Sequence, residues 1–283
     1  MNEAALARPV LKWAGGKRQL QAHILARLPP RIGTYYEPFV GGGAVFFALA
    51  SQGRFRRAVL GDRNPDLIAV YQALVEDVEG VIRALRKYRY SESEYYRVRE
   101  QQPRSLTGRA ARIIYLNKTG YNGLYRVNRA GQFNVPFGRH KSPMICDEKN
   151  LRAAAQALSR AQVISEDFEK VCRRARAGDA VYLDPPYLPV SKTSNFSAYD
   201  PLPFGVDEHQ RLAGVFEQLE ARGVDAVLSN SFTEQTRAIF GRFQYERVPV
   251  KRPINSNASR RGPADEILVV SRTGRRAAVA REG

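Results

Sequence analysis

The sequence has 283 residues, of which 43% are hydrophobic and 10% are aromatic, so it can bury a substantial core. It contains neither a run of roughly 20 apolar residues nor an apolar signal segment, so we expect a cytoplasmic protein without a membrane partner. Cys146 and Cys172 lie outside any Cys/His cluster, and we expect no disulfide framework and no bound metal. A formal net charge of +17 favours nucleic acid as partner, the alternatives being an acidic membrane surface or a merely basic protein.

The first part of the chain predicts a β-α-β-α unit around a glycine-rich turn. A β-prone run leads into the turn, an apolar helical run follows it, and the next buried strand ends in the carboxylate of Asp62. Asn64 is the expected N-cap of the following helix, which begins with Pro65. The expected elements are a strand at 34–37, the turn at 38–43, a helix at 44–50, a strand at 57–62 and a helix at 65–74.

Further strands are expected in the second half of the chain, with helical patterns between several of them. They lie at 161–164, 180–183, 225–229 and 266–271. Such alternation is typical of an α/β fold with a largely parallel sheet that helices cover on both faces.

Residues 71–143 differ from the rest of the chain and are interpreted as an insertion. The segment is charged and helical at first, then becomes rich in Gly, Asn, Arg and Tyr over residues 117–141, which predicts a hairpin and loops. One domain would then comprise residues 1–70 and 144–283, interrupted by this inserted subdomain.

The glycine turn at 41–43 lies where a strand leads into a helix, an arrangement that lets a ligand approach the backbone closely. Asp62, at the end of the next strand, is suited to bind ribose hydroxyls. Phe46 replaces the third glycine of a dinucleotide fingerprint, and Leu11 and Arg18 break a phosphate-loop pattern, so NAD and ATP are disfavoured. A purely structural glycine turn remains the alternative.

The tetrapeptide Asp184-Pro185-Pro186-Tyr187 follows the strand at 180–183, at the edge where open α/β sheets bind ligands. The two prolines stiffen the turn, so the Asp184 carboxylate and the Pro185 carbonyl form a rigid pair of acceptors. Two acceptors on the N–H bonds of a ring amine would free its lone pair for attack on a methyl group. Tyr187 offers a face on which an extruded base could stack. The alternatives are an ordinary turn with a surface aromatic, or metal binding by Asp184, for which no second ligand lies nearby.

Five segments in this order resemble the Dam-type DNA adenine-N6 methyltransferases of the α group, and the likeness covers nearly the whole chain. The matching segments are 11–20, 36–44, 122–128, 132–139 and 184–187. The resemblance implies a Rossmann-like methyltransferase fold in which residues 71–143 form a mainly helical DNA target-recognition subdomain with a hairpin.

The resemblance also implies S-adenosyl-L-methionine as cofactor. Lys17 would pair with its carboxylate beside Trp13, Asp62 would hold its ribose, and Asp167 and Phe168 would contact its adenine. The implied cofactor-binding residues are Trp13, Lys17, Phe39, Gly41, Asp62, Asp167, Phe168 and Asp184. The implied catalytic residues are Asp184, Pro185, Pro186 and Tyr187, acting on a flipped-out adenine.

The implied DNA contacts lie in the insertion. Tyr121 matches an aromatic that the family pushes into the duplex beside the target, and Asn122 would help to fill the gap. Arg126 has the chemistry to bind guanine O6 and N7. The full set is Lys118, Tyr121, Asn122, Leu124, Arg126, Pro136 and Lys141, of which Lys118 would contact phosphate and Lys141 the outer base pair. For any single Arg or Lys the alternative is a solvated surface charge.

The sequence therefore predicts an enzyme that methylates adenine N6 in double-stranded DNA, with GATC as the expected site and no covalent intermediate. Two alternatives stay open: a catalytically silent DNA-binding protein of the same fold, and an N6-methyltransferase acting on RNA or a related enzyme acting on a protein amide. We expect a nucleoid-associated monomer, with a cognate restriction endonuclease as a genetic rather than a physical partner.

Overall fold

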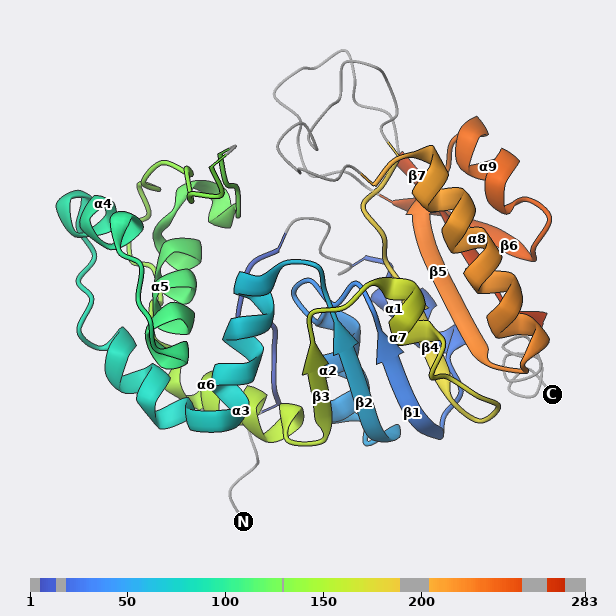
Figure 1. The fold of residues 1–283 in the computed structure, drawn as a ribbon, viewed down its shortest axis with the longest axis horizontal. Coiled ribbons are helices and arrows are strands. Elements are labelled where there is room, and N and C mark those ends of the chain that lie inside the picture. Colours follow the sequence, from blue (N-terminus) through green and yellow to red (C-terminus); the bar gives the residue numbers. More distant parts are fainter. Residues whose placement is uncertain (1–5, 14–18, 129, 189–203, 251–263, 273–283) are drawn as a thin grey trace. The chain divides into compact units, whose positions relative to one another are not determined.

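The computed structural model describes residues 6–13, 19–128, 130–188, 204–250 and 264–272. Helices and strands alternate along most of this part of the chain (Figure 1). The elements are α1 Gln21–Arg27, β1 Ile32–Glu37, α2 Ala44–Ser51, β2 Phe55–Gly61, α3 Pro65–Leu85, α4 Glu92–Glu100, α5 Leu106–Thr119, the 3-10 turn η1 Tyr121–Gly123, α6 Glu148–Leu158, β3 Ala161–Ile164, α7 Phe168–Cys172, β4 Ala180–Leu183, α8 Val206–Ala221, β5 Asp225–Ser231, α9 Glu234–Phe240, β6 Tyr245–Val250 and β7 Ala264–Val270.

Seven strands form one sheet in the order β3-β2-β1-β4-β5-β7-β6. The pairs β1/β4 and β4/β5 are parallel, whereas β7 is antiparallel to both β5 and β6. The order 3-2-1-4-5 is that of a doubly wound fold, whose chain reverses direction across the sheet between β1 and β4. The predicted α/β class with a mostly parallel sheet is confirmed.

The chain divides into two compact units. Unit 1 comprises Met1–Gly16, Val40–Gly53 and Val59–Glu166, and unit 2 comprises Lys17–Phe39, Arg54–Ala58 and Asp167–Gly283.

Unit 1 is built largely around the packing of α3 and α5 (Figure 1). Helix α3 begins as expected at Asn64, whose side chain accepts from the amides of Asp66 and Leu67, and it is interrupted at Asp77. Large aromatic side chains such as Tyr71 and Tyr115 are fully buried in this unit. Residues 71–143 contain α4, α5, η1 and an antiparallel bridge between Val127 and Phe133, as expected from their sequence, whereas their role as an inserted subdomain stays a prediction.

Unit 2 contains the centre of the sheet and the helices α7, α8 and α9. Helix α8 packs on β5 and against α7 and α9 (Figure 1). Strand β4 is buried along its whole length, and the aromatic side chains of Tyr35, Tyr182 and Phe216 fill the interior. A buried strand of this kind leaves its polar groups only at the strand end, which is where the Asp184 turn begins.

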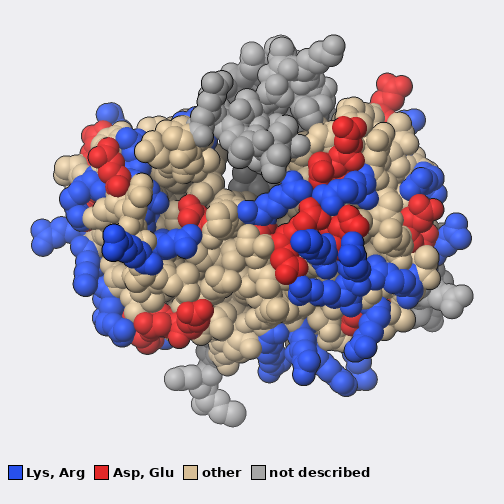
Figure 2. All heavy atoms as spheres, in the orientation of Figure 1, with Lys and Arg blue, Asp and Glu red and all other residues tan. Residues whose placement is uncertain are grey.

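In the described part of the chain no helix is both long and apolar enough to cross a membrane. Figure 2 shows Lys and Arg side chains spread over the visible face with Asp and Glu groups among them. The positive charge of this face is therefore distributed rather than gathered into one patch.

Candidate active site and DNA-contact surface

The glycine turn of unit 1 is closed by the carboxylate of Asp62. One oxygen of Asp62 accepts from the amide of Gly41 at 3.1 Å, and the other accepts from the amide of Asn64 at 2.9 Å. Gly41 and Gly43 have φ of 45° and 69°, a conformation that L side chains rarely adopt. Asp62 and the turn thus lie together as expected, whereas ribose binding by Asp62 stays a prediction.

Trp13 packs directly against this turn. A Cβ added at Gly41 would lie 2.9 Å from Trp13 Cδ1, so the close approach requires glycine. The indole also stacks on Tyr125, with ring centroids 5.4 Å apart, and the Tyr125 hydroxyl donates to Asp66 at 2.8 Å. An accessible backbone, a carboxylate acceptor and an aromatic side chain are groups that suit a nucleoside ligand. Lys17, which would complete the set, lies outside the described residues.

The Asp184 turn of unit 2 is held from below by β5. Ser229 donates to Asp184 Oδ1 at 3.2 Å, and its hydroxyl also lies 2.9 Å from that of Tyr182. Further along the turn, Ser231 donates to the carbonyl of Leu188 at 3.3 Å. Asp184 is half-buried, Pro185 is buried and Pro186 is exposed. The carboxylate is therefore oriented by its support and does not hang free in solvent.

Tyr187 is tied to the sheet through its hydroxyl. It donates to Glu266 of β7 at 2.5 Å, and the ring is half-buried. Burial, followed by the nearby charges of Asp184 and Glu266, raises the pKa of Tyr187 well above its ordinary value, so the hydroxyl stays protonated. A ring held at its far end cannot swing away, which suits a stacking platform better than a loose surface aromatic.

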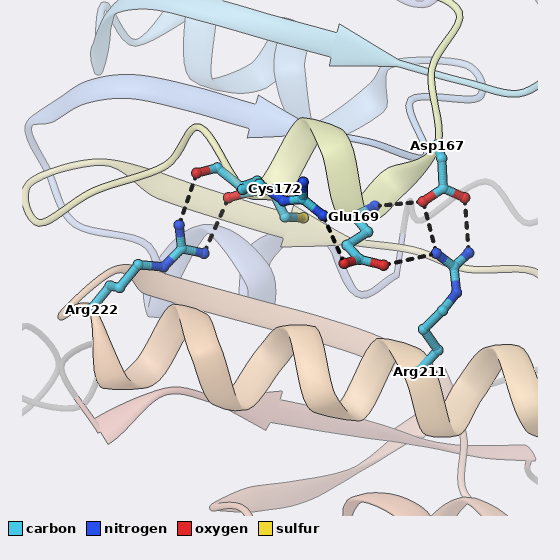
Figure 3. A network of polar contacts seen from close by, with 6 residues as sticks. Asp167, Glu169, Cys172, Arg211 and Arg222 are labelled. Atoms are coloured by element: carbon cyan, nitrogen blue, oxygen red, sulfur yellow. Dashed lines mark hydrogen bonds and ion pairs between the residues drawn. The ribbon is translucent and has the colours of Figure 1, made fainter.

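Phe39, Phe168 and Asp167 also come together in unit 2. Phe39 stacks on Phe168 with centroids 5.4 Å apart, and Phe204 contacts both rings. Phe168 is only 1% exposed, so its ring is already covered by protein. Asp167 caps α7 and is bound by Arg211 of α8 (Figure 3).

Most of the residues expected to contact DNA are presented on the surface of unit 1. Tyr121 is 53% exposed and Leu124 is 39% exposed, which is unusual for large apolar side chains. Asn122 between them is the one described non-glycine residue with a positive φ, 53°. The exposed members of the predicted set are Tyr121, Asn122, Leu124, Arg126, Pro136 and Lys141. We call this set the DNA-contact surface.

The hairpin and η1 carry this surface jointly. The amide of Tyr121 donates to the carbonyl of Pro136 at 2.9 Å, and Arg126 donates to the side chain of Asn134 at 2.7 Å. Lys118 differs from the others because it is half-buried, and this burial lowers its pKa. Its side chain is therefore the least solvated cation of the predicted DNA contacts.

Three residues that support the predicted site residues belong to no recognisable sequence motif. Ser229, Glu266 and Arg211 contact Asp184, Tyr187 and Asp167 from positions far away in the sequence. The polar run Ser229-Asn230-Ser231 at the end of a buried strand was the one available signal. Among the described residues, His, Cys, Asp and Glu side chains form no group of three that could hold a metal ion.

The doubly wound sheet, with a glycine turn following β1 and Asp-Pro-Pro-Tyr following β4, places the protein in the class of Rossmann-like α/β folds. The family described as D12 class N6 adenine-specific DNA methyltransferase matches residues 13–254, and the chain belongs to this family. The resemblance inferred from the five segments is thereby confirmed, and with it an adenine-specific DNA methyltransferase.

Several curated proteins are similar over nearly their whole length. The type II methyltransferase M1.LlaDCHI of Lactococcus lactis subsp. cremoris is 39% identical over 274 residues, covering 93% of this chain and 95% of that protein. M.MjaIII of Methanocaldococcus jannaschii is also 39% identical, covering 90% and 95%. The DNA adenine methylase of Escherichia coli K12 is 37% identical, covering 94% and 96%. An rRNA methylase structure from Streptococcus thermophilus has a TM-score of 0.38 at 10% identity, covering 92% of this chain and 99% of that chain.

Proposed function

We propose that the protein transfers a methyl group from S-adenosyl-L-methionine to N6 of an adenine flipped out of duplex DNA, within the sequence GATC. The observation that carries the chemistry is the supported acceptor at the end of β4, where Ser229 holds the carboxylate of Asp184. Membership of an adenine-specific family is the reason for proposing adenine as the target base. The matched segments are the reason for expecting GATC as the recognition sequence.

In this proposal the cofactor supplies an electrophilic methyl group when bound. Its binding residues are Trp13, Lys17, Phe39, Gly41, Asp62, Asp167, Phe168 and Asp184. The glycine turn gives the ligand access to backbone, and Asp62 offers an acceptor for hydroxyl groups. The ring of Phe168 is buried in this structure, so its contact with the cofactor requires a covering side chain to move aside.

The target amine is activated by acceptors rather than by a base. The Asp184 carboxylate and the Pro185 carbonyl would accept hydrogen bonds from the two N–H groups of adenine N6, which concentrates the lone pair on nitrogen. As N6 takes the methyl group, S-adenosyl-L-homocysteine would leave, and the proton that N6 loses would pass to the Asp184 carboxylate or to water. Tyr187, fixed by Glu266, stacks on the extruded ring, and Pro186 keeps the turn stiff. These residues touch the substrate and are the proposed catalytic residues.

Sequence recognition is assigned to the insertion, residues 71–143. Tyr121 and Asn122 occupy the space that the adenine leaves, whereas Leu124, Arg126, Pro136 and Lys141 contact bases. Lys118 contacts phosphate, and its incomplete solvation lowers the cost of leaving water. Each good base contact contributes about 1–3 kcal/mol of discrimination.

Two other functions have to be tested against this one. A catalytically silent DNA-binding protein would keep the DNA-contact surface but would not need the support beneath Asp184. An enzyme acting on RNA would need the same acceptors but no aromatic wedge such as the exposed Tyr121.

The decisive experiment is transfer of a labelled methyl group from S-adenosyl-L-methionine to duplexes that contain either GATC or a scrambled site. We expect label on GATC duplexes only, and loss of transfer with retained DNA affinity in Asp184→Ala. Equal labelling of both duplexes would refute the sequence assignment. Absence of label, or label on a matched RNA only, would refute the DNA methylation itself.

We also propose that the enzyme works as a nucleoid-associated monomer, because methylating one strand at a time requires no symmetry. A cognate restriction endonuclease would be a partner only in the genetic sense. Sedimentation of the protein with and without DNA tests the first statement, and inspection of the adjoining genes tests the second.

A further inference from the structure

Arg211 of α8 reaches the residues proposed to bind the cofactor's adenine without belonging to any matched motif. Its two terminal nitrogens donate to the two oxygens of Asp167 at 2.9 and 2.8 Å (Figure 3). This bidentate pairing fixes the plane of the carboxylate as well as its position. The same two nitrogens also donate to the carboxylates of Glu169 at 3.1 Å and of Glu208 at 2.7 Å.

The same guanidinium also covers Phe168. Its central carbon lies 4.1 Å from the ring centroid, within the range of a cation–π contact. Asp167 and Phe168 adjoin in sequence at the start of α7, so one side chain of α8 holds both of them. The partners are half-buried, with side-chain exposures of 33% for Arg211 and 26% for Asp167, so solvent screens the pairing only partly.

The chemistry of Asp167 depends on this arginine. An ionised carboxylate is an acceptor only, whereas a protonated one also donates. Arg211 also pairs with Glu169 and Glu208, so its guanidinium lies between three carboxylates and fixes the direction in which Asp167 offers its oxygens. A purine carries a donor at position 6 in adenine but an acceptor in hypoxanthine, and a fixed acceptor distinguishes the two.

We propose that Arg211 is a positioning residue that makes the Asp167–Phe168 pair selective for a purine bearing a 6-amino group. It acts through Asp167, whose carboxylate it orients by the bidentate contact, and does not touch the ligand itself. The inference rests on the proposed function, because it assumes that Asp167 and Phe168 meet the cofactor's adenine.

The test compares binding of S-adenosyl-L-homocysteine and S-inosyl-L-homocysteine by calorimetry, so that no turnover is needed. The wild type should prefer the adenosyl compound about ten- to hundredfold, the range of a hydrogen bond to a charged group. In Arg211→Gln this preference should shrink to about threefold or less, because the adenosyl affinity falls while the inosyl affinity barely changes. Arg211→Lys keeps the charge but not the bidentate fork and should be intermediate.

Arg222, which directly follows the last residue of α8, provides the matched control. It donates to the carbonyls of Cys172, Arg173 and Ala175, and thus holds the other end of α7 without contacting Asp167 (Figure 3). Arg222→Gln loses the same charge and should retain the full preference, even where its thermal stability drops. If Arg211→Gln fails to fold, the preference for the adenosyl compound is compared between Arg211→Lys and Arg222→Lys instead.

The outcomes separate this inference from the function on which it rests. An undiminished preference in both Arg211 variants, or an equal loss in the Arg211 and Arg222 variants, would overturn the role of Arg211 alone. A wild type that binds neither compound would instead refute the proposed cofactor. A preference lost only on substitution of Arg211 supports the inference.

Discussion

Ser229 lies directly beneath the proposed catalytic turn and is itself fully buried. Its hydroxyl has to donate to Asp184, because a carboxylate can only accept, and it can then accept from Tyr182. Burial raises the pKa of Tyr182 well above its ordinary value, so this phenol remains a donor. Two hydroxyls in series therefore support one carboxylate.

Replacing Ser229 with Ala should slow methyl transfer more than it weakens binding. A hydrogen bond to a charged group contributes about 1.5–3 kcal/mol. If about half of the upper value is lost from stabilisation of the transition state, kcat should fall roughly tenfold. Single-turnover rates, measured together with the DNA dissociation constant, check this. Ser159→Ala, at an exposed serine that ends α6, is the control. An unchanged rate in Ser229→Ala would mean that Asp184 needs no such support.

Single residues could be predicted from the sequence where they belong to a motif. The residues that contact and support those motif residues could not. Asp184 and Tyr187 could be predicted because four adjacent residues carry a recognisable chemistry. Glu266 and Arg211 could not, because their roles arise from β7 and α8 lying beside the turn and α7. Contacts between distant segments leave no local pattern in a single sequence.

The turn η1 presents an exposed aromatic for which the described fold gives no structural use. Tyr121 follows α5 immediately and is 53% exposed. Surface side chains of this kind contribute little to stability, usually within about 0.5 kcal/mol. Its exposure is consistent with the proposed contact to DNA.

Tyr121→Ala should impair base flipping and leave the thermal midpoint unchanged. Stacking on a base contributes about 1–3 kcal/mol, so methyl transfer should fall roughly five- to a hundredfold. The readout is the fluorescence of 2-aminopurine placed at the target adenine, which rises on extrusion from the duplex. Tyr121→Phe keeps the ring and should behave as wild type. Full fluorescence in the Ala variant would remove Tyr121 from the flipping step.

Helix α8 carries a histidine that is buried and neutral. His209 is 0% exposed. Its Nδ1 donates to the carbonyl of Gly205 at 2.7 Å, so its Nε2 accepts from the side-chain amide of Asn230 at 3.0 Å. Burial lowers the pKa of His209, against the opposing effects of the Gly205 and Pro186 backbone and of Glu208. Protonation would place a second N–H against the Asn230 amide, so the fold favours the neutral ring.

Stability should therefore decrease as the pH falls through the unfolded-state pKa of about 6.5. A lowered folded-state pKa means that the unfolded chain binds the proton more readily, so the contribution is present above that pH and lost below it. Urea unfolding at pH 7.5, 6.5 and 5.5 measures the slope. His209→Gln should be less stable at pH 7.5 but flatter across this window. A slope identical to wild type would assign the dependence to other groups.

Secondary structure could be predicted where local signals suffice. The strands at 161–164 and 180–183 have the predicted bounds, and the cap at Asn64 marks the start of α3 correctly. Helix α3 continues to Leu85, well beyond the predicted end at 74, with the break at Asp77. Strand β6 was missed because its Tyr-Glu-Arg-Val-Pro-Val sequence contains Pro249 and little apolar alternation, and it exists only through pairing with β7.

For the whole molecule, charge dominates the expected encounter with DNA. A net charge of +17 should draw the protein to any duplex regardless of sequence. Affinity should then depend steeply on salt, by about a thousandfold between 50 and 200 mM if about six phosphates are neutralised.

Lys118→Ala should make this dependence shallower by about one unit in the slope of log affinity against log salt. The loss should be equal on GATC and scrambled duplexes, because phosphate contacts carry no sequence information. Lys149→Ala, at an exposed lysine on α6, should leave the slope unchanged. An effect confined to GATC duplexes would reassign Lys118 to base recognition.

The place of β7 in the sheet has a consequence for how the protein is made. β7 follows β5 and β6 in the chain yet lies between them, so it is synthesised after both of its neighbours. Until it emerges from the ribosome, β5 exposes an open strand edge, the kind that recruits other chains into aggregates, and residues 245–250 have no strand to pair with. Glu266 arrives with β7 and secures Tyr187. We therefore expect chains halted before residue 264 to leave the β5 edge uncovered, whereas β7 covers that edge and at the same time brings Glu266 to Tyr187.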